Sequence, residues 1–164
     1  MSIGKGSGTG FDTMRSRNWP TIRQFSVFVE NRVGQLFDLM RVFEGSKVRV
    51  AAFSIVDSVD SAIVRLVVTH PEQGLELLRQ KGYALAESDL VGVELPRTSQ
   101  PILQVCTALL QAEINIHYAY PLLLHPHGRP AVALHVDSIE MAMNTLAEKG
   151  FTVLSEADLR SEEA

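Results

Sequence analysis

The segment His70–Leu90, "HPEQGLELLRQKGYALAESDL", decides the fold, because the chain repeats its pattern as "VDSIEMAMNTLAEKGFTVLSEADL" over Val136–Leu159. Each copy begins with an acidic residue or a proline and continues as an apolar helix. Lys-Gly-aromatic, a short strand and Glu-x-Asp-Leu then follow in both copies. The earlier parts of the two copies match at nearly the same offset as Gly82 and Gly150. An internal duplication therefore organises the chain.

Both copies predict the same order of elements: strand, helix, strand, strand, helix, strand. In the first unit, the expected elements are strand 24–30, helix 34–44, strands 48–56 and 62–69, helix 71–81 and strand 83–87. In the second, they are strand 90–95, helix 101–112, strands 114–120 and 131–136, helix 138–149 and strand 151–154. This order is the split βαβ, or ferredoxin-like, plan. The fold class is therefore α+β: two ferredoxin-like (βαββαβ) units in tandem, with antiparallel sheets and the helices on one face.

Composition changes mark the predicted domain boundaries. The Gly- and Ser-rich start "MSIGKGSGTG" predicts a flexible N-terminal tail over residues 1–22. The first unit is expected over 23–88 and the second over 89–159, with a C-terminal tail over 160–164. The acidic residues near the C-terminus are interpreted as a solvated end; they are Glu156, Asp158, Glu162 and Glu163. Because strand 83–87 runs almost directly into strand 90–95, we expect one shared sheet or rigid side-by-side packing.

The composition limits the possible partners and the compartment. The 164 residues are 46% hydrophobic and 21% charged, which is typical of a globular protein. A net charge of −4 disfavours binding to nucleic acid through phosphate neutralisation. No apolar run is long enough to cross a membrane, so no membrane partner is expected. Cys106 is the only cysteine, so no internal disulfide can form, and we expect a cytoplasmic protein.

A glycine marks the change from strand to helix in "FVENRVGQLFDLM", Phe28–Met40. After it, an amphipathic stripe begins with Leu36, Leu39, Met40 and Phe43. A helix start presents unpaired backbone N–H groups and a partial positive charge, so this junction is a candidate anion site. A structural interpretation is equally open, in which Asn31 caps the turn and Gly34 permits the tight entry.

Two stretches give the chain a family resemblance. "ENRVGQL" at the strand-to-helix junction resembles the Asp/Asn-x-Pro-Gly-x-Leu signature of ACT domains. "EINIHYAY", Glu113–Tyr120, is similar to the Gly-Ile-Asn-Ile strand entry of the same family. Over Arg23–Leu159 the chain resembles the small stand-alone proteins built of two tandem ACT domains. The order, the spacing and the duplication of these motifs carry the resemblance together.

The resemblance implies regulation rather than catalysis: a non-enzymatic protein that binds an amino acid or similar metabolite. No cofactor is expected. In ACT domains the ligand lies between two copies, against the first strand-to-helix loop of one and the second strand of the other. The candidate ligand-binding residues are then Asn31, Arg32, Val33, Gly34, Gln35, Leu36, Asn115, Ile116, His117 and Tyr118. Because neighbouring residues of a strand alternate between its faces, at most one of His117 and Tyr118 is expected to line the same wall of the pocket.

Two positions depart from the family pattern. Val33 replaces the usual proline, which leaves the first loop less rigid. Pro101 stands at the position matching Gly34 in the second unit, so that loop loses an N–H donor. We therefore expect the ligand at the Gly34 loop, facing the Asn115 strand. A proline near the second junction also predicts that Gly34→Pro keeps the fold while it removes a donor.

Metal binding and catalysis are the weaker alternatives. Four histidines gather in the second half of the chain: His117, His125, His127 and His135. They lack the paired spacing of a metal site, and no metal is expected. Cys106 is predicted to lie in the core, on an inward stripe with Leu103 and Leu110. Arg32 invites comparison with the phosphate loop of acylphosphatases, but no nucleophile–base pair accompanies it.

A third alternative is a non-catalytic dimerisation or interaction module that binds no ligand. A ferredoxin-like sheet has a bare face opposite its helices, and something must cover it. Strands such as "AIVRLVV" are apolar on both faces, which suggests that both sides of the sheet are buried. We expect homodimerisation through the sheet to provide this cover.

Overall fold

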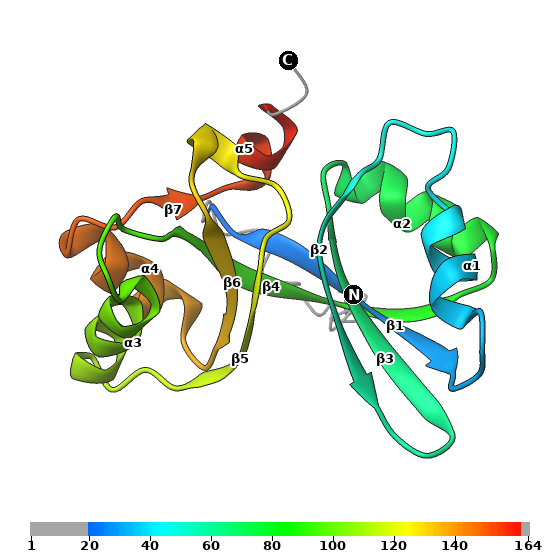
Figure 1. Cartoon of the computed structure of the whole chain (residues 1–164), viewed down its shortest axis with the longest axis horizontal. Coiled ribbons are helices and arrows are strands. Elements are labelled where there is room, and N and C mark those ends of the chain that lie inside the picture. The colour runs from blue at the N-terminus through cyan, green and yellow to red at the C-terminus, as the bar shows by residue number, and fades with distance from the viewer. Residues whose placement is uncertain (1–19, 162–164) are drawn as a thin grey trace, which may run out of the picture.

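The computed structural model describes residues 20–161 (Figure 1). Its strands are β1 (Ile22–Glu30), β2 (Val50–Asp57), β3 (Ser61–Val68), β4 (Ala84–Glu94), β5 (Ile116–Pro121), β6 (Ala131–Val136) and β7 (Val153–Leu154). Its helices are α1 (Gln35–Arg41), α2 (Pro71–Gln80), α3 (Pro101–Gln111), α4 (Ile139–Glu148) and α5 (Glu156–Arg160), with a 3-10 turn at Pro126–Gly128. Within this part of the chain, no helix has the length and hydropathy of a membrane-spanning segment.

Strand β4 joins the two units into one antiparallel sheet. The strand order is β2-β3-β1-β4-β6-β5, and β7 also pairs with β4. The first part of β4 pairs with β1, from Ala84 to Leu90, and its last residues pair with β6 and β7. The strand is therefore the last of one ferredoxin-like unit and the first of the next, which confirms the predicted fold class.

The prediction of two separate strands, 83–87 and 90–95, is wrong. Ser88 and Asp89 are not a turn, because they continue the ladder opposite Gln24 and Arg23 of β1. No glycine or proline separates the two stretches, so nothing in the backbone interrupts the pairing. The expected boundary between residues 88 and 89 falls inside this strand.

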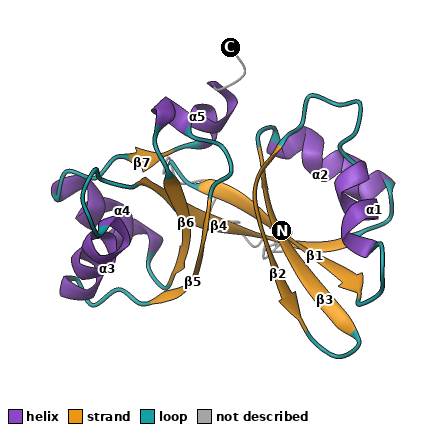
Figure 2. Ribbon diagram, in the orientation of Figure 1, coloured by secondary structure: helices purple, strands orange, loops and turns teal. Residues whose placement is uncertain are grey.

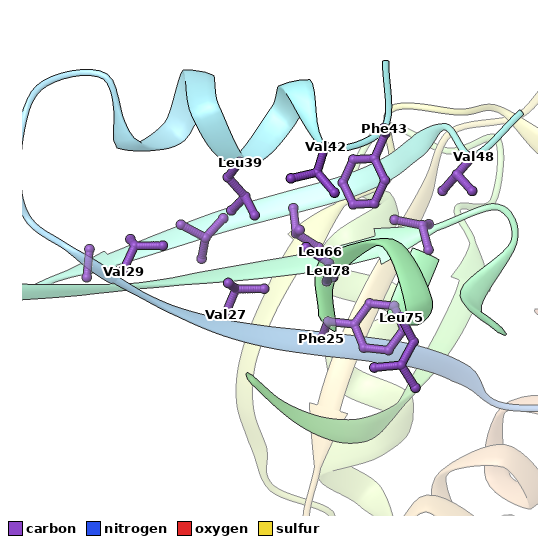
Figure 3. Close-up of a cluster of buried hydrophobic side chains, with 13 residues drawn as sticks. Phe25, Val27, Val29, Leu39, Val42, Phe43, Val48, Leu66, Leu75 and Leu78 are labelled. Carbon is purple, nitrogen blue, oxygen red and sulfur yellow. The ribbon is translucent and has the colours of Figure 1, made fainter. Parts of the chain in front are cut away.

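Helices α1, α2, α3 and α4 lie on the outer sides of the two units, and the uncovered faces of the sheet turn toward each other (Figures 1 and 2). Alternate residues of β1 and β3 point under α1 and α2, as Figure 3 shows for Phe25, Val27 and Leu66. The second unit repeats this arrangement under α3 and α4. Its core includes Val91, Val93, Val105, Leu109, Leu134 and Leu146.

The two uncovered faces pack on each other within one chain. A third buried cluster unites residues of both units: Ile22, Ala51, Ala52, Val67, Leu90, Tyr120, Leu122, Leu124, Ala131, Ala133, Leu154 and Leu159. The Leu123 N–H also donates to the Ala51 carbonyl across the contact, at 2.7 Å. Over this area each sheet face is covered by the other unit of the same chain. The sequence led us to expect that a second copy of the protein would cover it.

A buried amide adds hydrogen bonds between the units. Gln24 is fully buried, and its Nε2 donates to Ser88 Oγ at 2.9 Å and to the Tyr118 hydroxyl at 2.8 Å. The Tyr120 hydroxyl donates to Gln24 Oε1 at 2.6 Å, and burial raises the pKa of that phenol. The Arg65 guanidinium lies 3.7 Å from the Tyr118 ring centroid. The hydrogen-bonded Gln24 amide favours this arrangement of the two units, because a shift of one unit against the other would leave the buried amide unpaired.

Helix α3 presents to solvent the stripe that was predicted to face inward. Val105, Ala108 and Leu109 are its buried residues, whereas Cys106 and Leu110 are exposed. The prediction that Cys106 belongs to the core is therefore wrong. The helix is apolar on both sides, so periodicity alone offered two possible inward stripes.

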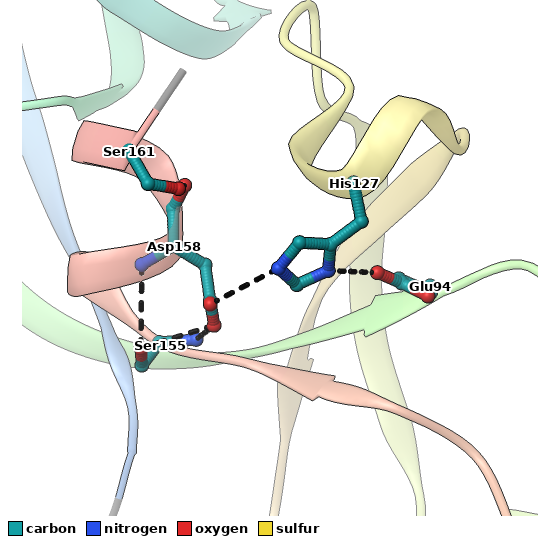
Figure 4. Close-up of polar contacts among 5 residues, drawn as sticks. All are labelled: Glu94, His127, Ser155, Asp158 and Ser161. Atoms are coloured by element: carbon teal, nitrogen blue, oxygen red, sulfur yellow. Dashed lines mark hydrogen bonds and ion pairs between the residues drawn. The ribbon is translucent and has the colours of Figure 1, made fainter. Parts of the chain in front are cut away.

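A fifth helix, α5, stands where a solvated end was expected. Ser155 and Asp158 form a capping box, with the Ser155 N–H donating to Asp158 Oδ2 at 2.7 Å (Figure 4). Leu159 is fully buried in the cluster between the units. The Glu156 carboxylate accepts from the Arg23 N–H at 3.2 Å. The segment is therefore part of the fold, and the buried side chain of Leu159 holds it there.

Candidate functional site

The Gly34 turn, which we define as Asn31–Leu36, connects β1 to α1. The Arg32 N–H donates to the Glu30 carbonyl at 3.0 Å, and the Gln35 N–H donates to the Arg32 carbonyl at 3.3 Å. Gly34 has φ +89°, in the left-handed region that glycine adopts without steric cost. The glycine is therefore required by the backbone of this turn.

Several N–H groups of the turn point to no protein acceptor. Within residues 20–161, the N–H groups of Val33, Gly34, Leu36 and Phe37 have no hydrogen-bond acceptor. Val33 is fully exposed, and a Cβ built on Gly34 would meet nothing within 4 Å. The turn thus presents open donors to any acceptor that approaches it. Helix α1 has only seven residues and is shorter than the predicted helix 34–44. The open N–H donors therefore contribute more to holding an anion than the dipole of this helix does.

The polar side chains of the turn are held by neighbours. Asn31 Nδ2 donates to Asp57 Oδ1 at 2.7 Å and to the Ser58 carbonyl at 3.1 Å, which ties the turn to the β2–β3 hairpin. Arg32 Nε lies 3.3 Å from Glu30 Oε2, and its side chain is 60% exposed. Asn31 thus braces the turn, while the Arg32 guanidinium remains accessible to solvent.

A shallow hollow lies beside α1, next to the Gly34 turn. It has a volume of about 390 Å³ and is lined by Asp38, Arg41, Val42, Lys81 and Tyr83. The Asp38 N–H donates to the Gly34 carbonyl at 2.9 Å, which fixes the hollow relative to the turn. Burial, and secondarily the Asp38 carboxylate, raises the pKa of Tyr83. One carboxylate and two cations in one hollow can pair with both charges of a zwitterion.

The predicted residues of the second unit lie at the start of β5. The Asn115 N–H donates to Asp137 Oδ1 at 3.2 Å, and its Nδ2 lies 3.4 Å from His117 Nδ1. Ile116 packs against the second core. Asn115 and Ile116 are thus already engaged with their own unit.

The expectation that His117 and Tyr118 occupy opposite faces is wrong. The ring centroids of both lie near that of His135, at 5.3 Å from His117 and 4.7 Å from Tyr118. The register of β5 against β6 shifts between Ile116 and Tyr118, which is the mark of a β-bulge. A bulge interrupts the alternation on which the expectation depended.

The Gly34 turn and Asn115 belong to different units. Helix α1 covers the outer side of the first unit, whereas β5 is the edge strand of the second unit and lies toward β2, on the side away from α1 (Figure 1). Among the described residues, no hydrogen bond, ion pair or ring contact joins the turn to residues 115–118. A pocket made by both therefore stays a prediction.

Pro101 does not stand at the position of Gly34. Gly34 is the residue before α1, and its counterpart before α3 is Gln100, while Pro101 is the first helical residue, as Gln35 is in α1. Proline fixes φ near −65° and cannot adopt the +89° of Gly34. The equivalence of Pro101 and Gly34, on which the expectation for Gly34→Pro rested, is therefore wrong, and a proline at position 34 would have to change the backbone of the turn.

The four histidines do not form one cluster, because the rings of His117 and His135 lie together whereas His127 contacts other residues. His127 bridges two carboxylates, with Nδ1 2.5 Å from Glu94 Oε1 and Nε2 3.4 Å from Asp158 Oδ1 (Figure 4). The hydrogen bond with Glu94 is the main cause of a raised His127 pKa. Within the described part of the chain, no group of His, Cys, Asp and Glu side chains is arranged to hold a metal ion. Sequence spacing gave no sign of this bridge, because its members are far apart along the chain.

Comparison with known proteins agrees with this architecture. The sequence profile of a family described as an ACT domain pair matches residues 20–162. The structure of protein BT0572 from Bacteroides thetaiotaomicron is similar, with a TM-score of 0.77 and 23% identity over 86% of this chain and 96% of that one. The regulatory subunit of aspartate kinase from Thermus thermophilus has a TM-score of 0.55 and 12% identity, over 81% of this chain and 95% of that one. No curated protein matches the chain. At these identities, the two structures show a shared fold.

Proposed function

The chain belongs to the ACT domain pair family, and from this premise we propose that it is a non-catalytic regulatory protein whose ligand is a free α-amino acid. The proposed ligand site is the Gly34 turn together with the hollow beside α1. One protein of the same fold is the regulatory subunit of aspartate kinase, which supports a regulatory role. We place the protein in the cytoplasm, where its lone thiol stays reduced.

The observation that carries the proposal is the set of open N–H donors at the Gly34 turn. A carboxylate accepts several hydrogen bonds at once, and backbone donors around a glycine allow it to approach closely. Val33, Gly34, Leu36 and Phe37 provide such donors on an exposed surface. A ligand carboxylate satisfies these donors better than disordered water does, because the donors are already fixed in place.

The neighbouring hollow supports an amino acid over a simple carboxylic acid. Asp38 lines it and can pair with an ammonium group, while Arg41 and Lys81 add positive charge on the same surface. In the second unit, the positions in α3 that match Asp38 and Arg41 are occupied by the neutral Gln104 and Thr107. The proposal therefore assigns the ligand to the first unit.

Asn115 is the proposed second contact, through its side-chain amide. Asn115 is exposed in the free protein, and the expected result of Asn115→Ala is binding weaker by about 1–3 kcal/mol, the usual cost of leaving unpaired a polar group that the bound ligand would bury. Isothermal titration of both proteins measures it. Equal affinities would confine the ligand to the Gly34 turn and the hollow.

The test of the function is a thermal-shift screen of the purified chain against the standard amino acids. A ligand at a hundred times its dissociation constant stabilises the fold by about 2.7 kcal/mol. The matched controls are the amide and the decarboxylated amine of any amino acid that scores, and both are expected to lose the shift. If no amino acid stabilises the protein, the alternative of an interaction module without ligand replaces this proposal.

A further inference from the structure

The charges that line the hollow beside α1 do not balance, and the excess is positive. Two cations, Arg41 and Lys81, line it together with one carboxylate, that of Asp38. The Arg32 guanidinium also acts on Tyr83 and lowers its pKa, against the larger effects of burial and Asp38, so a third positive charge lies nearby. A zwitterion with a neutral side chain would therefore leave positive charge in the hollow without a counter-charge.

Two of the charged groups in the hollow have no partner of their own. Among the described residues, neither Lys81 nor Asp38 forms an ion pair. Arg41 differs, since its Nε lies 3.2 Å from Glu44 Oε2, but both of these side chains are mostly exposed. An exposed ion pair of this kind contributes little to stability, so a ligand can replace it. Lys81 and Asp38 are thus available to a ligand, and Arg41 can join them.

The duplicated unit keeps only part of this arrangement. Residues 149–151 repeat the Lys-Gly-aromatic sequence of residues 81–83. The Lys149 Nζ, however, donates to Gln111 Oε1 at 2.5 Å, and the aromatic residue is Phe151, which has no hydroxyl group. The second unit thus has the lysine at the same position but with a partner inside the protein, which makes Lys149 a matched control.

We propose that the ligand is an acidic amino acid, whose side-chain carboxylate is held by Lys81 and Arg41. This inference rests on the proposed function, because it assumes that an amino acid binds at the Gly34 turn and the hollow. The backbone donors of the turn bind the α-carboxylate, Asp38 pairs with the ammonium group, and Lys81 pairs with the second carboxylate. A basic side chain would instead face two like charges, which disfavours it.

Tyr83 and the size of the hollow agree with the same ligand. The hollow has a volume of about 390 Å³, near the lower end of the range of about 300–1,000 Å³ for small-molecule sites. Burial raises the pKa of Tyr83, so its hydroxyl stays protonated at neutral pH and can donate to a carboxylate. The side-chain carboxylate of the ligand thus meets a neutral donor as well as two cations.

The first test compares ligands that differ in one group. L-Aspartate and L-glutamate carry the second carboxylate, whereas L-asparagine and L-glutamine carry an amide of nearly the same shape. In isothermal titration of the unmodified protein, an acidic amino acid should bind at least about tenfold more tightly than its amide. An amide that binds as tightly as its acid would overturn the inference.

The second test removes the lysine from each unit in turn. Lys81→Met should raise the dissociation constant of the acidic amino acid about tenfold and leave that of the amide nearly unchanged. Lys149→Met is the control and should change neither constant. Both lysines are exposed, and thermal denaturation without ligand checks that both variants fold. If Lys81→Met weakens the acid and the amide equally, Lys81 does not recognise the second carboxylate.

The third test concerns the ammonium group of the ligand. Succinate has two carboxylates but no ammonium group, so the Asp38 carboxylate should repel it. Asp38→Asn should therefore weaken the binding of L-aspartate about tenfold and strengthen that of succinate. A variant that weakens both ligands alike would contradict the pairing of Asp38 with the ammonium group.

The same titrations, extended to all standard amino acids, separate this inference from the proposed function. If an acidic amino acid binds most tightly and Lys81→Met removes its advantage over the amide, both are supported. If a neutral or basic amino acid binds more tightly than both acidic ones, the proposed function stands and the inference is wrong. If no standard amino acid binds, the proposed function itself fails, and the inference fails with it.

Discussion

One backbone angle at Gly34 sets how the first strand enters α1. The same left-handed angle occurs at Gly45, where φ is +75°, and at both glycines a Cβ would meet nothing within 4 Å. An L-residue in this region costs about 1–2 kcal/mol. An alanine at either glycine should therefore have a similar backbone cost and similar room for its methyl group. Only Gly34 lies in the proposed ligand site.

Gly34→Ala is expected to lower the free energy of unfolding by about 1–2 kcal/mol in urea denaturation and to weaken amino-acid binding. The methyl group fills the path by which a carboxylate reaches the backbone donors. Gly45→Ala is the control, with a similar loss of stability and unchanged binding by titration. If both variants bind the amino acid equally well, the ligand does not bind at the Gly34 turn.

The His127 bridge predicts a pH dependence of stability. Glu94 and Asp158 raise the His127 pKa in the folded state above its unfolded value of about 6.5. The protonated form thus favours folding, so the contribution is full below about pH 6.5 and is lost as the pH rises through the raised folded pKa. His127→Asn should therefore destabilise the protein most in acid and least in mild base. Urea titrations between pH 5.5 and 8.5 measure this, and a difference that does not vary with pH would contradict the bridge.

At the scale of elements, α5 depends on one apolar anchor. Leu159 is fully buried between the units, so Leu159→Ala should cost about 2–5 kcal/mol, as large-to-small core substitutions do. Arg160→Ala, at the exposed neighbouring position, should change the stability little. Urea denaturation compares the two variants. A small cost at Leu159 would mean that α5 contributes little to the fold.

Most elements were predictable from the sequence because their periodicity and breakers agree. Helices α2 and α4 have one apolar stripe and end in a Lys-Gly pair, and their predicted positions are close to the observed ones. Helix α3 was placed correctly along the chain but rotated wrongly, since both of its sides are apolar. Helix α5 was missed because its short segment shows a single large apolar residue, Leu159, whose partners are distant in sequence.

The candidate site was only partly predictable. The turn geometry at Gly34 follows from local sequence, because a glycine between a strand and a helix is a local signal. The hollow beside it was not foreseen, since Asp38 and Arg41 meet Lys81 and Tyr83 only through packing. The bulge before Tyr118 could not be predicted from the sequence pattern either, because the register of a strand depends on the neighbouring strand.

At the scale of the whole molecule, β4 makes the two units one sheet. Gly92 lies on this strand, where an added Cβ would come 2.2 Å from Ile22 Cδ1 and 3.3 Å from Leu154 Cβ. Ile22 and Leu154 are both fully buried, so neither can move freely. Gly92→Ala is expected to cost about 1–3 kcal/mol through overpacking.

Because the strand is shared, this loss should lower the stability of both units together. Hydrogen exchange in increasing urea follows peptides of each unit separately, and the units should lose protection at the same denaturant concentration. Loss of stability in the second unit alone would show that the units fold independently.

The central claim, that a free amino acid binds at the Gly34 turn, is tested most directly by amide hydrogen exchange with and without a mixture of the standard amino acids. The N–H groups of Val33, Gly34, Leu36 and Phe37 have no acceptor among the described residues, so they should exchange fast in the free protein. The account predicts that the mixture slows exchange in peptides that cover residues 31–37. Unchanged exchange there, whether or not other segments become protected, would contradict it.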